Sequence, residues 1–157
     1  MKEADFLTKL KKEGKLLFVE PSEEIKNAYL KKSESFLSSA KILLASEKLE
    51  ESVSMAYYSM YYITLALFFR VGIKCENHTA TIILLEKIFS IDNSKLSFAK
   101  KERVDKQYYI DFHITKEEVK DLIKSAEAYN AMLYDFIARL NVEKILEFRK
   151  KFKKILR

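Results

Sequence analysis

The chain has 157 residues, 48% of them hydrophobic, with two glycines, one proline and one cysteine. This length fits one domain with a sizeable core, and so few glycines and prolines exclude a turn-rich β-protein. The net charge of +6 is no argument for nucleic acid binding by the whole domain, because residues 141–157 alone hold seven Lys or Arg against two Glu.

The N-terminal segment, MKEADFLTKL, is charged and lacks the apolar stretch of a secretory signal. Residues 3–17 are interrupted by Gly14 and predict a weak helix or an arm within an N-terminal unit of residues 1–21. We expect its apolar residues to dock on the rest of the chain. The single cysteine, Cys75, cannot form an internal disulfide, so a reducing, cytoplasmic location is expected.

The segment after Pro21 has the pattern of a helix start. Ser22 can accept a hydrogen bond from the first turn, and two glutamates follow it at the positive end of the helix dipole. Apolar residues then recur at helical spacing up to about Leu49. The short polar link at residues 47–51 indicates that this helix and the next lie antiparallel.

The stretch from Ser52 to Gly72 carries no charge through Phe69 and is apolar on nearly every face of a helix. Such a helix is buried on most sides, and Gly72 stands where a left-handed residue would end it. A membrane span is the alternative, but tyrosines lie in mid-run rather than at the ends. We therefore expect the central helix of a bundle, with tyrosines that bond across it or stack a base, namely Tyr57, Tyr58, Tyr61 and Tyr62.

Three more helices are expected after the central one. Asn77 can cap the first of them. Thr115 and Glu118 have the spacing of a capping box, which marks the start of the third. The expected helices cover residues 78–89, 95–109 and 116 to about 140, with a loop at residues 73–77 and a turn at residues 92–94.

Residues 141–157 form a basic amphipathic helix in this interpretation, either capped by Asn141 or continuous with the helix before it. Phe148 and Phe152 share one face and basic residues cover the rest. The helix can be docked through the phenylalanines, contact RNA phosphates, or lie on an anionic membrane surface. Weak candidates for phosphate contacts are Arg149, Lys150 and Lys153.

Four segments follow one another along the chain: residues 28–44, Met55–Met60 (MAYYSM), Asn77-His78 with Ile82 and Ile83, and Arg103–Tyr108 followed by Thr115–Glu118 and residues 125–127. Taken in this order, they resemble the HEPN family of small helical domains. The likeness covers residues 22–140 and implies an all-α, up-and-down bundle of four or five helices, often dimeric, to which residues 141–157 add a basic helical extension. Many HEPN domains are encoded beside a minimal nucleotidyltransferase in toxin–antitoxin or related pairs.

Some members of this family are metal-independent RNases with an Arg-x4–6-His motif. There the arginine steadies phosphate and the histidine performs acid–base catalysis. Counted from Arg103, the histidine window falls on residues 108–110 and holds no histidine. The resemblance therefore implies the subfamily without the RNase motif, a binding module for a nucleotide, RNA or a partner nucleotidyltransferase. The expected site residues are Arg103, Lys106, Tyr108 and His78.

Two alternatives remain open at this point. One is an RNase toxin that uses a displaced histidine, His78 or His113. The other is a structural adaptor whose apolar central helix completes a dimer. No cofactor is expected, and two histidines and one cysteine without close spacing predict no metal site.

Overall fold

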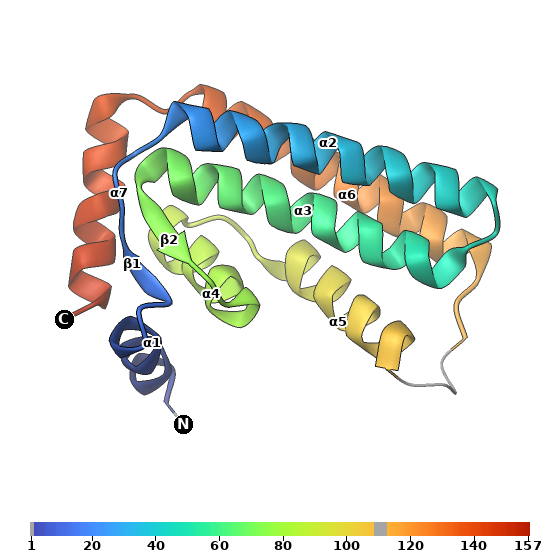
Figure 1. Ribbon diagram of the computed structural model, residues 1–157, viewed down its shortest axis with the longest axis horizontal. Helices are drawn as coiled ribbons and strands as arrows, with labels where there is room; N and C mark the ends of the chain where they lie inside the picture. Colours follow the sequence, from blue (N-terminus) through green and yellow to red (C-terminus); the bar gives the residue numbers. More distant parts are fainter. Residues whose placement is uncertain (1, 109–112) are drawn as a thin grey trace.

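The computed structural model describes residues 2–108 and 113–157, and within them it is an all-α bundle with one small sheet. Figure 1 shows α2, α3 and α6 as long rods that lie side by side, with α5 against α3 and α7 across one end. The predicted fold class is confirmed. The elements are α1 (Glu3–Lys12), β1 (Leu16–Phe18), α2 (Glu23–Ala45), α3 (Leu49–Val71), β2 (Ile73–Cys75), α4 (His78–Phe89), α5 (Ser94–Tyr108), α6 (Lys116–Ala138) and α7 (Val142–Ile155).

Helix α3 is the central helix that the charge-free run from Ser52 to Phe69 predicts, and it packs against α2, α5 and α6. Several polar side chains inside this core form hydrogen bonds with one another or with the backbone, as buried polar groups usually do. The Ser52 hydroxyl donates to the Ala40 carbonyl at 2.7 Å, and the Thr64 and Tyr129 hydroxyls lie 2.6 Å apart. Within the described ranges, no helix has the length and apolar character to cross a bilayer.

The turn between α2 and α3 corrects one predicted boundary. Helix α2 ends at Ala45, not near Leu49, and α3 already begins at Leu49. Glu47 adopts a left-handed φ of 58°, its N–H donates to the Leu44 carbonyl, and the Lys48 N–H donates to the Leu43 carbonyl at 2.8 Å. This is a Schellman motif, in which a glutamate takes the place of the usual glycine and so leaves no sequence signal.

The loop predicted at residues 73–77 is wrong in part, because residues 73–75 form a strand, β2. It pairs antiparallel with β1, with Leu16 opposite Cys75 and Phe18 opposite Ile73. Strands of three residues, joined across more than fifty residues of chain, show no periodicity that the sequence could reveal. The expected docking of the N-terminal segment is confirmed, since Leu7, Leu10 and Leu16 are buried.

Helix α7 is a separate helix, and Asn141 caps it by accepting the Lys144 N–H at 2.8 Å. Helix α6 accordingly ends at Ala138 rather than near Leu140. The apolar face of α7 packs on the end of the bundle, where the Phe152 ring lies 4.7 Å from that of Phe18. Of the three roles considered for the basic helix, the structure therefore shows docking through its phenylalanines.

Arg149 of α7 holds the chain where α3 ends. Gly72 has the predicted left-handed conformation, with φ of 87°. The Arg149 Nη1 donates to the carbonyls of Val19, Val71 and Gly72, each at 3.0 Å. A cation at these carbonyls satisfies acceptors that the end of a helix leaves open.

Candidate functional site

The first turn of α4 presents His78 toward the tyrosines of α3. The helix begins at His78 because the Asn77 side chain accepts the Ala80 N–H at 2.9 Å. The His78 Nδ1 lies 2.6 Å from the Tyr57 hydroxyl oxygen. The Tyr61 ring stacks on the imidazole with centroids 3.9 Å apart and planes 9° apart. His78 is therefore held in one orientation by two side chains of α3.

Helix α5 places two cations beside this histidine. Lys100 and Arg103 are three residues apart, so they share one face of the helix. The Lys100 Nζ donates to the Thr79 hydroxyl at 2.7 Å. The Arg103 guanidinium lies over the rings of Tyr57 and Tyr58, 5.3 Å from each centroid, and its Nη1 donates to the Tyr58 hydroxyl at 3.4 Å. We call Tyr57, Tyr58, His78, Lys100 and Arg103 the His78 cluster.

Burial and positive charge set the protonation states in the His78 cluster. The pKa of His78 is lowered to about 4, first by burial and then by the charges of Arg103 and Lys100. Burial and the Arg103 charge also lower the pKa of Lys100. Burial raises the pKa of Tyr57. At neutral pH the His78 imidazole and the Tyr57 phenol are thus both neutral, and one proton is shared between them. The two cations beside them, Lys100 and Arg103, are close enough to repel each other.

The low pKa of His78 predicts a loss of stability in acid. The unfolded chain takes up a proton near the ordinary value of 6.5 and the folded one only near 4. The free energy of unfolding therefore falls as the pH drops through this window, by on the order of 1–2 kcal/mol because the ring is partly exposed to solvent. Urea unfolding of wild type and His78→Gln at about pH 7 and about pH 4.5 measures this.

In that experiment His78→Gln should lose less stability than wild type between the two pH values. His113→Gln, a change at an exposed histidine, serves as the matched control and should behave like wild type. If His78→Gln and wild type lose the same stability, His78 does not have a lowered pKa in the folded protein.

The structure brings two of the four predicted site residues together, Arg103 and His78. Lys106 and Tyr108 belong to α5, but their side chains lie outside the described part of the chain. Sequence reasoning missed Lys100, although its spacing from Arg103 on a predicted helix was a usable signal. Tyr58 is one of four tyrosines in the middle of α3, and nothing in the sequence shows which of them lies next to α5.

The remaining candidates lie elsewhere. His113 lines a surface pocket with the turn between α2 and α3. One groove, lined by Phe18 of β1 and Leu146 of α7, also includes Arg149, Lys150 and Lys153. The Arg149 Nη1 there is engaged by backbone carbonyls, as described above. Phosphate contacts by these three basic residues stay a prediction.

Comparison with known proteins identifies a family to which this chain is similar. A family model described as HEPN domain matches residues 27–152. The matched residues run from α2 into α7 and so include the whole His78 cluster. Comparison with curated proteins finds no match. Among the described residues there is no group of three or more His, Cys, Asp or Glu that could hold a metal ion.

Proposed function

The chain belongs to the HEPN domain family, and from that premise we propose that it binds a phosphate-bearing ligand, RNA or a nucleotide, at the His78 cluster. The observation that carries the proposal is the convergence of Lys100 and Arg103 beside the first turn of α4. Ammonium and guanidinium groups are strong phosphate ligands, and the start of a helix adds partial positive charge. Lys106 and Tyr108, one turn further along α5, are proposed to extend the same site.

An anion at this position would also relieve an electrostatic cost. Lys100 and Arg103 each lower the pKa of His78, and Arg103 lowers that of Lys100. These shifts mean that positive charges face one another over a short distance. A bound phosphate would turn this repulsion into two charge-assisted hydrogen bonds. The ring of Tyr58, already covered on one side by Arg103, offers a surface on which a base can stack.

Substitution on α5 tests the proposal. Lys100→Ala and Arg103→Ala should each weaken binding of ATP and of a short RNA by about tenfold or more, since each removes a charged hydrogen bond. Each should also lose about one phosphate contact with RNA. In a plot of the logarithm of affinity against the logarithm of salt concentration, this loss makes the slope less steep by about 0.7. Titration calorimetry over a range of salt concentrations gives both quantities.

Lys101→Ala is the matched control, because Lys101 is an exposed lysine on the same helix, next to Lys100. Lys101→Ala removes one positive charge, as Lys100→Ala and Arg103→Ala do. It should leave the affinity for ATP and RNA, and the salt dependence of RNA binding, nearly as in wild type. Equal affinity of wild type, Lys100→Ala and Arg103→Ala would remove the site assignment.

We further propose, on family membership alone, that the chain forms a homodimer and works with a nucleotidyltransferase in a toxin–antitoxin-like pair. Light scattering at several protein concentrations tests the dimer. A monodisperse monomer at all of them would contradict both the dimer and the reading as a structural dimeric adaptor. Co-purification with a nucleotidyltransferase encoded beside this chain tests the second partner.

A metal-independent RNase is the second candidate function, and the proximity of His78 to Arg103 is what favours it. The structure brings an arginine and a histidine together although the sequence motif lacks its histidine. A histidine with a pKa of about 4 is unprotonated at neutral pH, so it can accept a proton but has none to donate. This candidate would be ruled out if the protein leaves RNA intact in EDTA, or if His78→Ala and His113→Ala both cut RNA as well as wild type does.

A further inference from the structure

A row of aromatic side chains runs along the face that α2 and α3 share. Its members are partly exposed to solvent, unlike the fully buried rings of the core. Contiguous apolar surface of this kind marks an interaction site more often than scattered exposed residues do. We call this set the aromatic row, and it consists of Tyr29 and Phe36 of α2 and Tyr58, Tyr62 and Phe69 of α3.

The rings of the aromatic row touch one another without a break. Tyr29 stacks on Phe69 at 5.5 Å and on Tyr62 at 5.9 Å. Tyr62 stacks on Tyr58 at 5.9 Å between ring centroids, and the rings of Phe36 and Tyr62 form a T-shaped pair at 5.0 Å. Because neighbouring rings support each other, the row is a firm surface rather than a set of mobile side chains.

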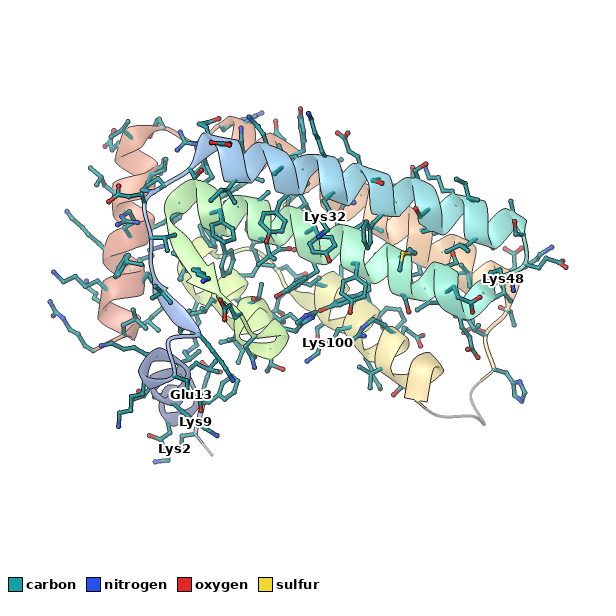
Figure 2. The ribbon with its side chains drawn as sticks, viewed as in Figure 1. Lys2, Lys9, Glu13, Lys32, Lys48 and Lys100 are labelled. Atoms are coloured by element: carbon teal, nitrogen blue, oxygen red, sulfur yellow. The ribbon has the colours of Figure 1, made fainter. Side chains whose placement is uncertain are left out.

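Cations flank the aromatic row on both sides of α3. The Lys32 Nζ lies 4.5 Å from the centre of the Tyr62 ring, and Arg103 reaches the Tyr58 hydroxyl. Figure 2 shows Lys32 on α2 and Lys100 on α5, on opposite sides of α3. Near the Phe69 end, the carboxylate of Glu23 is paired with Lys26 and Arg70. The charged side chains that these contacts place beside the rings are thus mainly cations.

We infer that the aromatic row and Lys32 continue the His78 cluster into a binding surface for a single strand of RNA several nucleotides long. This inference rests on the proposed function and narrows it from any phosphate-bearing ligand to an extended one. Aromatic rings beside positive side chains are how proteins bind single strands without reading their sequence. The phosphates would meet Lys32, Lys100 and Arg103, while bases lie against the rings.

The dimensions of the row fit a short strand. From Tyr58 to Phe69 it extends about 16 Å along α3, at about 1.5 Å per helical residue. Stacked nucleotides follow one another at about 3.4 Å along a strand. The row therefore matches about five stacked nucleotides, or fewer if the strand is stretched. A mononucleotide would occupy only the Tyr58 end, beside the His78 cluster.

A second copy of the chain is a less favourable occupant of this face. In a two-fold interface the same patch meets itself. Here that would bring Lys32, Lys100 and Arg103 of the two copies close together, and like charges across an interface are costly. A polyanion neutralises the same cations, so charge complementarity favours RNA.

Affinity as a function of strand length tests the inference. For wild type, we expect oligoadenylates to bind more tightly with each added nucleotide from one to about five, with a plateau beyond. Tyr62→Ala should weaken binding of the pentamer at least about fivefold and leave binding of AMP unchanged. Lys32→Ala changes an exposed side chain and should not disturb folding. It should weaken binding of the pentamer and make the dependence of log affinity on log salt concentration less steep by about 0.7.

Tyr134→Ala is the control, because Tyr134 is an exposed tyrosine of α6 that lines a pocket on the other side of α2. It should bind the pentamer like wild type. If AMP binds wild type as tightly as the pentamer, the inference is overturned while phosphate binding at the His78 cluster stands. If Tyr62→Ala changes the oligomeric mass but not the affinity for the pentamer, the row is an interface between copies, which also overturns it. Binding weakened by about tenfold or more in Lys100→Ala, with normal affinity and length dependence in Lys101→Ala, supports both proposals.

Discussion

Replacing Gly72 with alanine is expected to lower the free energy of unfolding by about 3–5 kcal/mol. Gly72 has a φ of 87°, where an alanine costs about 1–2 kcal/mol. A Cβ there would collide with the Arg149 guanidinium and come within 2.5 Å of the Val19 carbonyl oxygen and 3.0 Å of the Pro21 nitrogen. Arg149 would have to give up charged hydrogen bonds worth about 1.5–3 kcal/mol each. Urea denaturation measures the change.

Gly14→Ala is the matched control for this experiment. Gly14 also has a left-handed φ, 72°, but nothing lies within 4 Å of the Cβ that an alanine would add. This variant should therefore show the conformational cost alone, about 1–2 kcal/mol. Equal losses in the two variants would mean that the Arg149 contacts at the end of α3 contribute little to stability.

Truncating Phe152 to alanine is expected to cost about 3–5 kcal/mol, the range for a large aromatic side chain lost from a core. Phe152 is fully buried and its ring lies 4.7 Å from that of Phe18. The loss would be large because the variant removes a fully buried ring and leaves a cavity between α7 and β1. Thermal or urea unfolding, monitored by circular dichroism, provides the measurement.

Leu146→Ala is the control for Phe152→Ala, because Leu146 lies on the same helix and is 54% exposed. It should change stability by about 0.5 kcal/mol or less. If Phe152→Ala is no more destabilising than Leu146→Ala, then α7 is an appendage, as the division into residues 22–140 and 141–157 assumes. The expected result instead makes α7 part of the same cooperative unit, which fits a family match that extends to residue 152.

Local chemistry made the long helices predictable. Ser22, Asn77, Thr115 and Asn141 are the caps that the sequence suggested, and each accepts a backbone N–H of its helix. The run without charge from Ser52 to Phe69 likewise indicated burial, because a helix that is apolar on nearly every face is buried on most sides. These signals lie within a few residues of the feature they specify, so a single sequence suffices to find them.

Features that depend on distant contacts were not predictable. The pairing of β1 with β2 joins residues 16–18 to residues 73–75. Arg149 was considered as a phosphate ligand because it stands among lysines, yet its guanidinium reaches three carbonyls of two other segments. Its role was hidden because a charged residue in a basic helix has the same sequence pattern whether it faces solvent or backbone.

The candidate site was half predictable for the same reason. Arg103 and His78 were identified through the resemblance to a family, not through spacing, because they lie on different helices. Lys100 shares a helix face with Arg103, but its proximity to Thr79 appears only once α4 packs beside α5. The aromatic row needed the packing of α2 on α3, since its rings alternate between the two helices.

The most direct test of ligand binding at the His78 cluster is an NMR titration of labelled protein with an RNA of about five nucleotides, the length matched to the aromatic row. We expect the largest shift changes at the His78 ring and the Lys100 and Arg103 side chains, with further changes at Tyr62. Shift changes confined to the basic face of α7, or their complete absence at saturating RNA, would contradict binding at this site.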